Sequence, residues 1–260
     1  MTKFPVKIFI FTILSMIFLF KSSAYAETVK IIAEDDWYPY SAKFPDGPKG
    51  IAVDISRAAF EAEGYTVDFE SMNYDRCMEL VKDGEAIGCF DAPRSDEIEN
   101  IYLWHDEKLY AAEGHFYVRP DFQEKIKTLK DLAGKKVGLT QGYGYGSEID
   151  LNTEMLKEYS KTDTILIQKL VGKRLDIILL WDKCADYLIP KLDVPGQIKA
   201  EGPTQSIDLY IAFSKKNPEG QKYRDIFSKG FKKIKENGTY QKIWEDWDAK
   251  LKATPADKSH

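Results

Sequence analysis

Two successive series of strand and helix patterns constrain the fold of this chain more than any other feature of its sequence. In the first series, residues 28–33 read as a strand, 51–62 as a helix and 65–69 as a strand with alternating apolar residues. The second series includes a strand at 136–139 and a helix at 165–171. Repeated strand–helix units predict an α/β protein with a mostly parallel sheet that is covered by helices.

The remaining elements complete the two series. Further strands are expected at 86–90, 115–118, 176–181 and 209–213, and further helices at 73–83, at 129–132, after Ser147, after Asn217 and after Thr239. No Gly/Ser-rich or Pro-rich linker separates the series in the sequence. We therefore expect strands that cross from one series to the other to join them, and not a flexible tether.

The N-terminal segment 1–26 has the pattern of a secretory signal peptide. Lys3 and Lys7 give a positive start, residues 8–20 form a largely apolar run, and residues 22–26 end in the small-x-small pattern of a cleavage site. The apolar run is short for a membrane span, which needs about 20 residues. We expect cleavage after this segment and a soluble, periplasmic mature protein. The alternative is an uncleaved segment that anchors the protein at a membrane.

Composition and missing motifs exclude several classes of function. The chain has 260 residues and a formal net charge of −5, so we expect no broad basic surface for nucleic acid. Three His and three Cys are too few for a Cys/His zinc cluster. The sequence has no P-loop, no G-x-S-x-G and no H-E-x-x-H motif. We therefore expect no metal, no cofactor and no catalytic residue, and hence no enzyme.

The three cysteines leave an alternative open. Export makes disulfides possible, and Cys77 and Cys89 lie 12 positions apart, so they could pair and leave Cys184 over. Because Cys77 falls in an expected helix and Cys89 in an expected strand, both could equally be small buried apolar residues.

Two features of the first series could bind a small molecule. The loop 34–40 follows the first strand, at the strand end where open α/β sheets bind ligands. Its acidic and aromatic residues could offer a cation a counter-charge and an aromatic face, or they could form a solvated loop over core aromatics. Arg94, just past another strand, could hold a carboxylate with two hydrogen bonds. The alternative for Arg94 is a surface ion pair with Asp91 or Asp96.

Two further features belong to the second series. The glycine-rich turn at 142–147 precedes a helix, whose free N–H groups attract an anion, although it could also be a plain tight connection. Asp182 ends an apolar strand and could receive an ammonium group, or it could cap the following helix. Together the four features suit a zwitterion such as an amino acid, because they offer opposite charges and an aromatic wall.

The sequence resembles the family 3 extracellular solute-binding proteins, which are the polar amino-acid receptors of ABC importers. The resemblance covers nearly all of residues 27–251 and rests on five fragments in the family's order. They are Trp37-Tyr38-Pro39-Tyr40, Gly50-Ile51-Ala52-Val53-Asp54-Ile55, Leu129-Lys130-Asp131-Leu132-Ala133-Gly134-Lys135-Lys136-Val137-Gly138, Gly172-Lys173-Arg174-Leu175-Asp176 and Gly238-Thr239-Tyr240-Gln241-Lys242-Ile243-Trp244.

The resemblance implies a two-lobe fold of the type II periplasmic binding proteins. Two α/β lobes would be joined by two crossing strands, with the ligand cleft between them. One lobe would comprise residues 27–117 and 212–260, and the other residues 118–211. The resemblance further implies a monomer that closes over a small-molecule ligand and presents it to the permease of an ABC importer.

The resemblance also implies roles for residues of the first lobe. Trp37 matches the aromatic residue that stacks on the ligand, and Glu34 matches an acid that meets the ligand's side chain. Arg94 matches the arginine that binds the α-carboxylate. The Ser/Thr cluster that precedes the arginine in the family is not evident here.

In the second lobe, Gly144 and Tyr145 match the turn that donates to the same carboxylate, and Asp182 matches the acid that receives the α-ammonium group. The family often has Thr at the position of Gly144, so only backbone donors remain there. Asp182 lies one residue farther from Asp176 than the family spacing, which places Trp181 at that position unless the strand has a bulge.

The expected function is therefore the capture of a small polar solute, an amino acid by the resemblance, for an ABC importer. Two other functions are compatible with the same scaffold. One is a soluble ligand sensor that reports to a membrane receptor. The other is an enzyme similar to cyclohexadienyl dehydratases, in which an acid in the cleft transfers a proton.

Overall fold

The computed structural model describes residues 27–253. The expected signal peptide, residues 1–26, and residues 254–260 lie outside the described residues. Within 27–253, no helix is both long enough and apolar enough to cross a bilayer.

One nine-stranded sheet runs through the whole molecule. Its order is β10-β9-β11-β8-β12-β6-β1-β5, and β7 pairs with β12 beside this path. The strands are β1 (Thr28–Glu34), β5 (Thr66–Met72), β6 (Gly88–Pro93), β7 (Tyr102–Trp104), β8 (Tyr110–Val118), β9 (Lys136–Thr140), β10 (Leu156–Ser160), β11 (Ile177–Trp181) and β12 (Lys199–Ser214). β1–β5 and β9–β10 pair in parallel, as the repeated strand–helix units predict.

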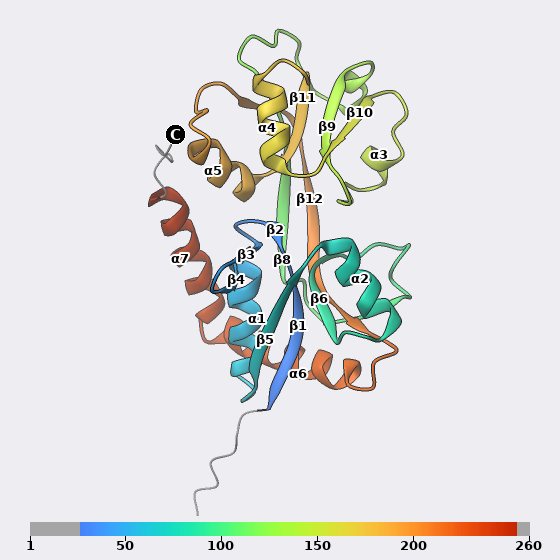
Figure 1. Cartoon of the computed structure of the whole chain (residues 1–260), viewed down its shortest axis with the longest axis vertical. Helices are drawn as coiled ribbons and strands as arrows, with labels where there is room; N and C mark the ends of the chain where they lie inside the picture. The colour runs from blue at the N-terminus through green and yellow to red at the C-terminus, as the bar shows by residue number, and fades with distance from the viewer. Residues whose placement is uncertain (1–26, 254–260) are drawn as a thin grey trace, which may run out of the picture.

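Two long strands connect the two ends of this sheet. β8 and β12 pair antiparallel from Tyr110–Leu209 to Val118–Lys199. Beyond this pair, β12 contacts β6 and β7, while β8 contacts β11. Figure 1 shows β8 and β12 passing between the lower and the upper group of elements. The expected connection by crossing strands is therefore confirmed.

Helices surround each end of the sheet. We call the elements β1–β7 with α1, α2, α6 and α7 the first half, and β9–β11 with α3–α5 the second half (Figure 1). The helices are α1 (Ile51–Glu61), α2 (Tyr74–Asp83), α3 (Ser147–Asp150), α4 (Asp163–Val171), α5 (Asp182–Lys191), α6 (Gly220–Glu236), α7 (Thr239–Ala253) and the 3-10 turn η1 (Leu129–Leu132).

Local chemistry sets several helix boundaries where the sequence predicts them. The Asn73 side chain accepts a hydrogen bond from the N–H of Asp75 and caps α2, and Gly84 ends this helix in the left-handed region at φ 90°. Thr162 caps α4 in the same way, through the N–H of Ile165. In the interior, a Cβ on Gly230 would lie 1.8 Å from the Ala59 carbonyl oxygen, so only glycine lets α6 approach α1 this closely.

The structure also contains elements that the sequence patterns do not reveal. A small antiparallel sheet of β2 (Asp36–Trp37), β3 (Ser41–Phe44) and β4 (Gly47–Lys49) occupies the breaker-rich stretch after β1. β10 is an edge strand whose Leu156 and Tyr159 side chains are exposed, so it has no apolar alternation. α5 follows β11 without a loop.

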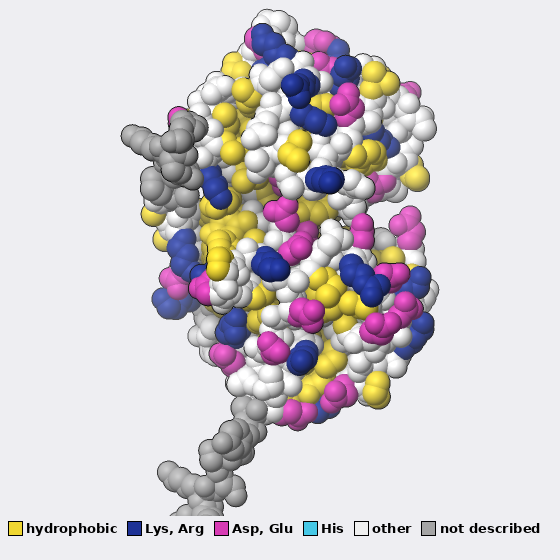
Figure 2. Space-filling model, in the orientation of Figure 1, with side chains coloured by type: hydrophobic (Ala, Val, Ile, Leu, Met, Phe, Trp, Pro, Cys, Tyr) yellow, Lys and Arg dark blue, Asp and Glu magenta, His cyan; other side chains and the backbone are white. Residues whose placement is uncertain are grey.

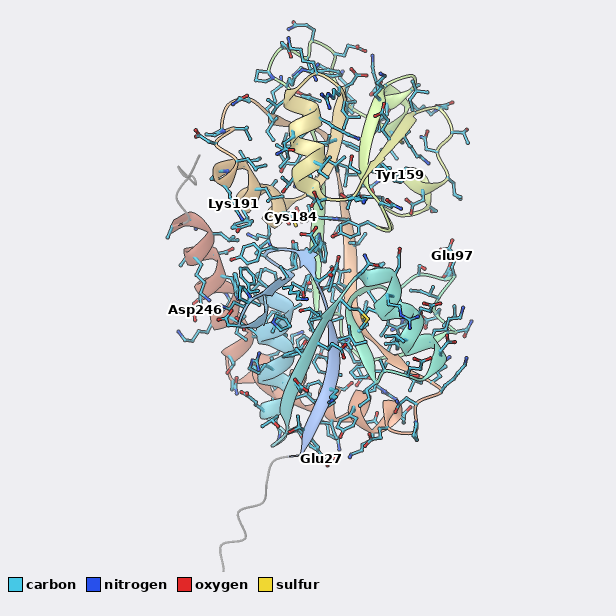
Figure 3. The ribbon with its side chains drawn as sticks, viewed as in Figure 1. Glu27, Glu97, Tyr159, Cys184, Lys191 and Asp246 are labelled. Atoms are coloured by element: carbon cyan, nitrogen blue, oxygen red, sulfur yellow. A yellow bond between two sulfur atoms is a disulfide. The ribbon has the colours of Figure 1, made fainter. Side chains whose placement is uncertain are left out.

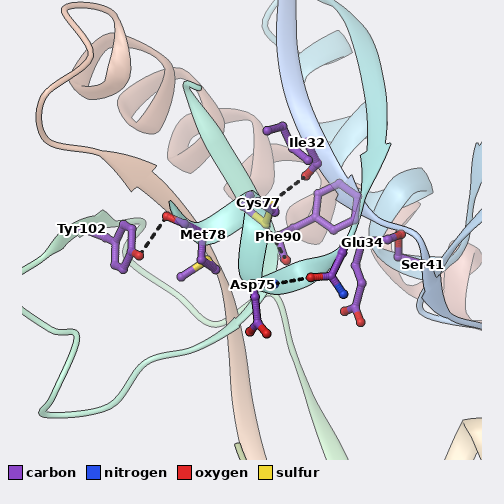
Figure 4. Close-up of a disulfide and its surroundings, with 10 residues drawn as sticks. Ile32, Glu34, Ser41, Asp75, Cys77, Met78, Phe90 and Tyr102 are labelled. Atoms are coloured by element: carbon purple, nitrogen blue, oxygen red, sulfur yellow. Dashed lines mark hydrogen bonds between the residues drawn. A yellow bond between two sulfur atoms is a disulfide. The ribbon is translucent and has the colours of Figure 1, made fainter. Parts of the chain in front are cut away.

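The structure resolves the question of the cysteines. Cys77 of α2 and Cys89 of β6 form a disulfide with their Cα atoms 6.0 Å apart, which joins the helix to the strand beneath it (Figure 4). The pairing is thus confirmed over the alternative of two reduced apolar side chains. Cys184 is a free, buried thiol.

We predict that the Cys77→Ala/Cys89→Ala variant loses about 3 kcal/mol of unfolding free energy, because the disulfide restricts a short loop of the unfolded chain. Urea unfolding followed by circular dichroism measures this loss. Reducing agent should lower the stability of the wild-type protein to a similar level and should leave the double variant unchanged. Equal stability of the oxidised wild type and the variant would contradict the prediction.

Candidate functional site

A small cavity lies where the two halves meet. Its wall combines residues from the ends of β1, β6 and β11, from the glycine-rich turn after β9, and from the crossing strand β12. The lining residues are Glu34, Trp37, Tyr74, Asp91, Pro93, Tyr143, Gly144, Trp181, Ile207 and Leu209. Since β1, β6 and β11 all end here, the cavity lies at the strand ends where α/β sheets bind ligands. Figure 2 shows acidic and apolar side chains side by side at the waist between the two halves.

Aromatic rings from both halves form one side of the cavity. Trp37 of the first half packs edge-on against Tyr143 and Trp181 of the second half, each with ring centroids 6.0 Å apart. Tyr40 lies behind Trp37 at 4.4 Å and stacks on Tyr110 at 5.0 Å. The wall therefore offers the edges and faces of several electron-rich rings to a guest.

Asp91 is the most unusual residue of the wall. It is 3% exposed and adopts a left-handed backbone conformation at φ 67°. The Tyr110 hydroxyl donates a hydrogen bond to Oδ1, while Oδ2 is buried without a hydrogen-bond partner among the described residues. Burial raises the pKa of Asp91 to about 7, although the Tyr110 hydrogen bond acts in the opposite direction.

Glu34 is the second buried acid of the wall. It is 4% exposed, and burial followed by the negative charge of Asp91 raises its pKa well above the ordinary value. Its backbone carbonyl accepts a hydrogen bond from Ser41 Oγ at 2.5 Å, which holds the loop after β1. Two carboxyl groups thus share one enclosed space.

No cation balances these two acids in the cavity wall. Among the described residues that line it, none is Lys, Arg or His. A buried carboxylate is unfavourable unless it is paired, so a positively charged guest would stabilise the ionised forms of Glu34 and Asp91. The arrangement can therefore bind a small cation through charge, hydrogen bonds and aromatic rings.

The structure brings together three of the six predicted ligand-binding residues in the wall. Glu34, Trp37 and Gly144 line the cavity. Trp181, the last residue of β11, lines it too, and the pairing of β11 with β8 has no bulge. Without a bulge, the family spacing places Trp181, and not Asp182, at the position of the acid that receives the α-ammonium group. The aromatic residues of the 34–40 loop are largely buried, and of its three acids Glu34 alone lines the cavity wall.

Arg94 does not line this cavity. It is exposed, and its Nε and Nη2 atoms donate to the two carboxylate oxygens of Glu99 at 2.6 Å each. Its guanidinium group lies over the rings of Trp104 and Tyr210. A groove between the halves contains Arg94, together with Glu97, which Figure 3 labels on the rim of the first half. This groove adjoins the cavity and shares Pro93, Gly144 and Ile207 with it. Arg94 is thus part of a surface ion pair, with a partner other than the two aspartates considered from the sequence.

Tyr145 and Asp182 also lie behind the cavity wall. The Tyr145 ring is buried and stacks on Trp181, its hydroxyl accepts from the Thr140 N–H at 2.7 Å, and its own N–H donates to Asp150 at 3.0 Å. Asp182 is the first residue of α5 and accepts a hydrogen bond from the Tyr40 hydroxyl at 2.8 Å. This last contact joins the first half to the second.

Sequence reasoning missed Asp91, Tyr74, Tyr143 and the apolar contributions of β12 to the wall. For Asp91 a signal existed in the sequence, because this acid stands between the apolar residues Phe90 and Ala92, directly after the expected strand run 86–90. A charged residue in such a position indicates either a binding role or an ion pair.

The raised pKa of Asp91 predicts how the stability of the folded protein depends on pH. Because the folded-state pKa is about 7 and the ordinary value is 3.8, the ligand-free protein loses stability as the pH rises between these two values. We predict that Asp91→Asn raises the melting temperature by a few degrees at pH 8, and by much less at pH 5, where Asp91 is protonated. Scanning calorimetry at both pH values measures the difference.

The exposed Asp96 supplies the matched control. Asp96→Asn should change the melting temperature by less than about a degree at either pH, since surface substitutions are close to neutral. A gain for Asp91→Asn that is equal at pH 5 and pH 8 would show that ionisation of this group is not the cause.

Comparisons with known proteins agree with this architecture. The arginine-binding extracellular protein ArtP of Bacillus subtilis (strain 168) is 23% identical over 219 residues, which cover 82% of each chain. An ancestral arginine-binding protein bound to arginine is 21% identical with a TM-score of 0.73, over 85% of this chain and 97% of that chain. A histidine kinase sensor domain similar to periplasmic binding proteins is 19% identical with a TM-score of 0.74, over 85% and 96%.

The similarity to these structures shows the fold, two α/β lobes joined by crossing strands. A family model described as "Bacterial extracellular solute-binding proteins, family 3" matches residues 29–250. Because this match spans nearly all of the described chain, the protein belongs to the bacterial extracellular solute-binding proteins of family 3.

Proposed function

We propose that this protein captures a small cationic solute, chemically related to the basic amino acids, for an ABC importer. The observation that carries the proposal is the pair of buried carboxyl groups, Glu34 and Asp91, in a cavity wall without a lysine, arginine or histidine among the described residues. Further support comes from two of the similar proteins, ArtP and the ancestral protein, which are both described as arginine-binding.

Binding would act by closure of the two lobes, which we assign to residues 27–117 with 212–260 and to residues 118–211. The cavity wall is complete only when both lobes contribute, because Trp37 comes from one and Trp181 from the other. A ligand that contacts both lobes stabilises the closed arrangement over the open one. The closed monomer would then be recognised by the permease.

A thermal-shift screen of amino acids and their amine derivatives tests the proposed binding of a cationic solute. We predict that cationic amino acids or their amine derivatives raise the melting temperature, because a ligand that binds only the folded state adds about 3–4 kcal/mol at 100 to 1,000 times its Kd. Neutral and acidic amino acids should give no shift. Differential scanning fluorimetry in an amine-free buffer measures this. A shift with acidic amino acids alone, or with no compound of the screen, would refute the proposal.

Transport separates an importer component from a sensor. Uptake of the radiolabelled ligand that gives the largest shift should fall several-fold in cells that lack this protein, and it should recover when the protein is restored. Unchanged uptake, together with a ligand-dependent response of a membrane receptor, would favour the sensor function instead.

The hydrogen bond from Tyr40 to Asp182 provides a test of lobe closure. We predict that Tyr40→Phe weakens ligand binding about three- to tenfold, because it removes one hydrogen bond between the lobes and leaves the Asp182 carboxylate without this donor. The loss should lie in the dissociation rate, which stopped-flow tryptophan fluorescence measures.

Tyr102→Phe is the matched control, since the Tyr102 hydroxyl donates to the Met78 carbonyl within one lobe. This variant should lose stability to a similar degree and keep the ligand affinity of the wild type. If both variants lower affinity equally, the Tyr40–Asp182 contact has no specific part in closure.

A further inference from the structure

Two of the three groups predicted to bind a ligand carboxylate, including the only cation among them, are already engaged within the protein. Arg94 donates two hydrogen bonds of 2.6 Å to Glu99 and lies outside the cavity wall. In the glycine-rich turn, the N–H of Tyr145 donates to Asp150 at 3.0 Å. Two of the predicted donors for a carboxylate, Arg94 and the N–H of Tyr145, therefore already bind carboxylates of the chain itself. The Gly144 N–H has no such partner among the described residues, but as a neutral donor it cannot balance a full negative charge.

The cavity itself disfavours a negatively charged group. Glu34 and Asp91 are both more than nine-tenths buried, and the charge of Asp91 acts directly on Glu34. A third carboxylate in this space would be desolvated beside two acids, with no cation among the described lining residues to balance it. Like charges in a buried space raise each other's energy.

The unpartnered polar atoms of the wall favour a positively charged ligand. Oδ2 of Asp91 is a buried acceptor without a partner among the described residues. Nε1 of Trp37 is a buried donor that also has no hydrogen-bond partner among the described residues. It is neutral, however, and cannot balance a full negative charge. One ammonium or guanidinium group would satisfy Asp91 with a charge-assisted hydrogen bond.

From this juxtaposition, and resting on the proposed solute-binding function, we infer that the ligand is an amine or guanidine without a carboxylate. Its cationic group binds between Glu34 and Asp91, with the rings of Trp37, Tyr143 and Trp181 around it. The apolar side chains of Ile207 and Leu209 line the same cavity and contact the hydrocarbon part of the ligand.

Two adjoining grooves provide competing arrangements. One shares Pro93, Gly144 and Ile207 with the cavity and contains Arg94, whose guanidinium group is already paired with Glu99. The other is an outer groove. It shares Glu34 and Tyr143 with the cavity and also contains Lys43 and Lys161, which are both exposed. An amino acid whose side chain enters the cavity would have to extend its carboxylate outward to these lysines. Amino acids and their decarboxylated counterparts distinguish the two arrangements directly.

The experiment compares matched pairs of ligands that differ only by the carboxylate. Isothermal titration calorimetry would use arginine with agmatine, lysine with cadaverine, and ornithine with putrescine, in an amine-free buffer. We expect the amine of at least one pair to bind ten or more times tighter than its amino acid. If every amino acid that binds does so as tightly as its amine, or more tightly, the inference is overturned while the proposed function stands. If neither member of any pair binds, the proposed function fails as well.

Two variants test which charged residue determines ligand binding. Asp91→Asn should weaken binding of the preferred amine at least thirtyfold, since it removes one partner of a buried charge pair. Arg94→Ala should change the affinity less than twofold, because Arg94 pairs with Glu99 outside the cavity. A large loss for Arg94→Ala would show that the ligand carries a carboxylate and would contradict the inference.

A third variant, Glu34→Gln, keeps the inference testable if Asp91→Asn does not fold. It should weaken amine binding at least tenfold, while circular dichroism and the melting temperature report whether the fold is retained. Full amine affinity in either folded acid variant would remove that acid from the site.

Discussion

The antiparallel pairing of β8 with β12 is the constraint on which the rest of the structure depends. These two strands pair from Tyr110–Leu209 to Val118–Lys199. β12 pairs further with β6 in one lobe, and β8 pairs with β11 in the other. Because they are the shared part of one sheet, the ends of β1, β6 and β11 meet at the same place. Ile207 and Leu209 of β12 lie in the wall of that cavity, so the crossing strands and the site share residues.

The second organising feature is electrostatic. Glu34 and Asp91 are held in an apolar, aromatic enclosure, where ionisation is unfavourable and where a cation would relieve the cost. Arg94, outside the cavity wall, is instead paired with Glu99. The interior thus holds two carboxyl groups without a counter-charge among the described lining residues, and this is the basis for the cationic ligand proposed above.

Much of the fold could be predicted because its signals are local. Asn73 caps α2 through its own side chain, Gly84 ends this helix, and Thr162 starts α4. β10 and the small β2–β3–β4 sheet could not be predicted, since they are held by pairing with distant or irregular segments and lack apolar alternation. For the site, the position of the 34–40 loop at a strand end was sufficient to indicate Glu34 and Trp37, whereas Tyr74 and Tyr143 become neighbours only when the lobes meet.

The sequence by itself determined the two series of strands and helices, several helix boundaries and the resemblance to the family, because each follows from periodicity, capping or motifs within short stretches. Tertiary structure alone decided that Asp91 faces the cavity while Arg94, three residues later, lies at the surface. At Asp91 the backbone is left-handed, and the pairing of β12 with β6 shifts register between Tyr210 and Ala212. Such an irregularity breaks the two-residue alternation of side chains along a strand. The face of the sheet to which each side chain points then depends on the pairing with the neighbouring strand.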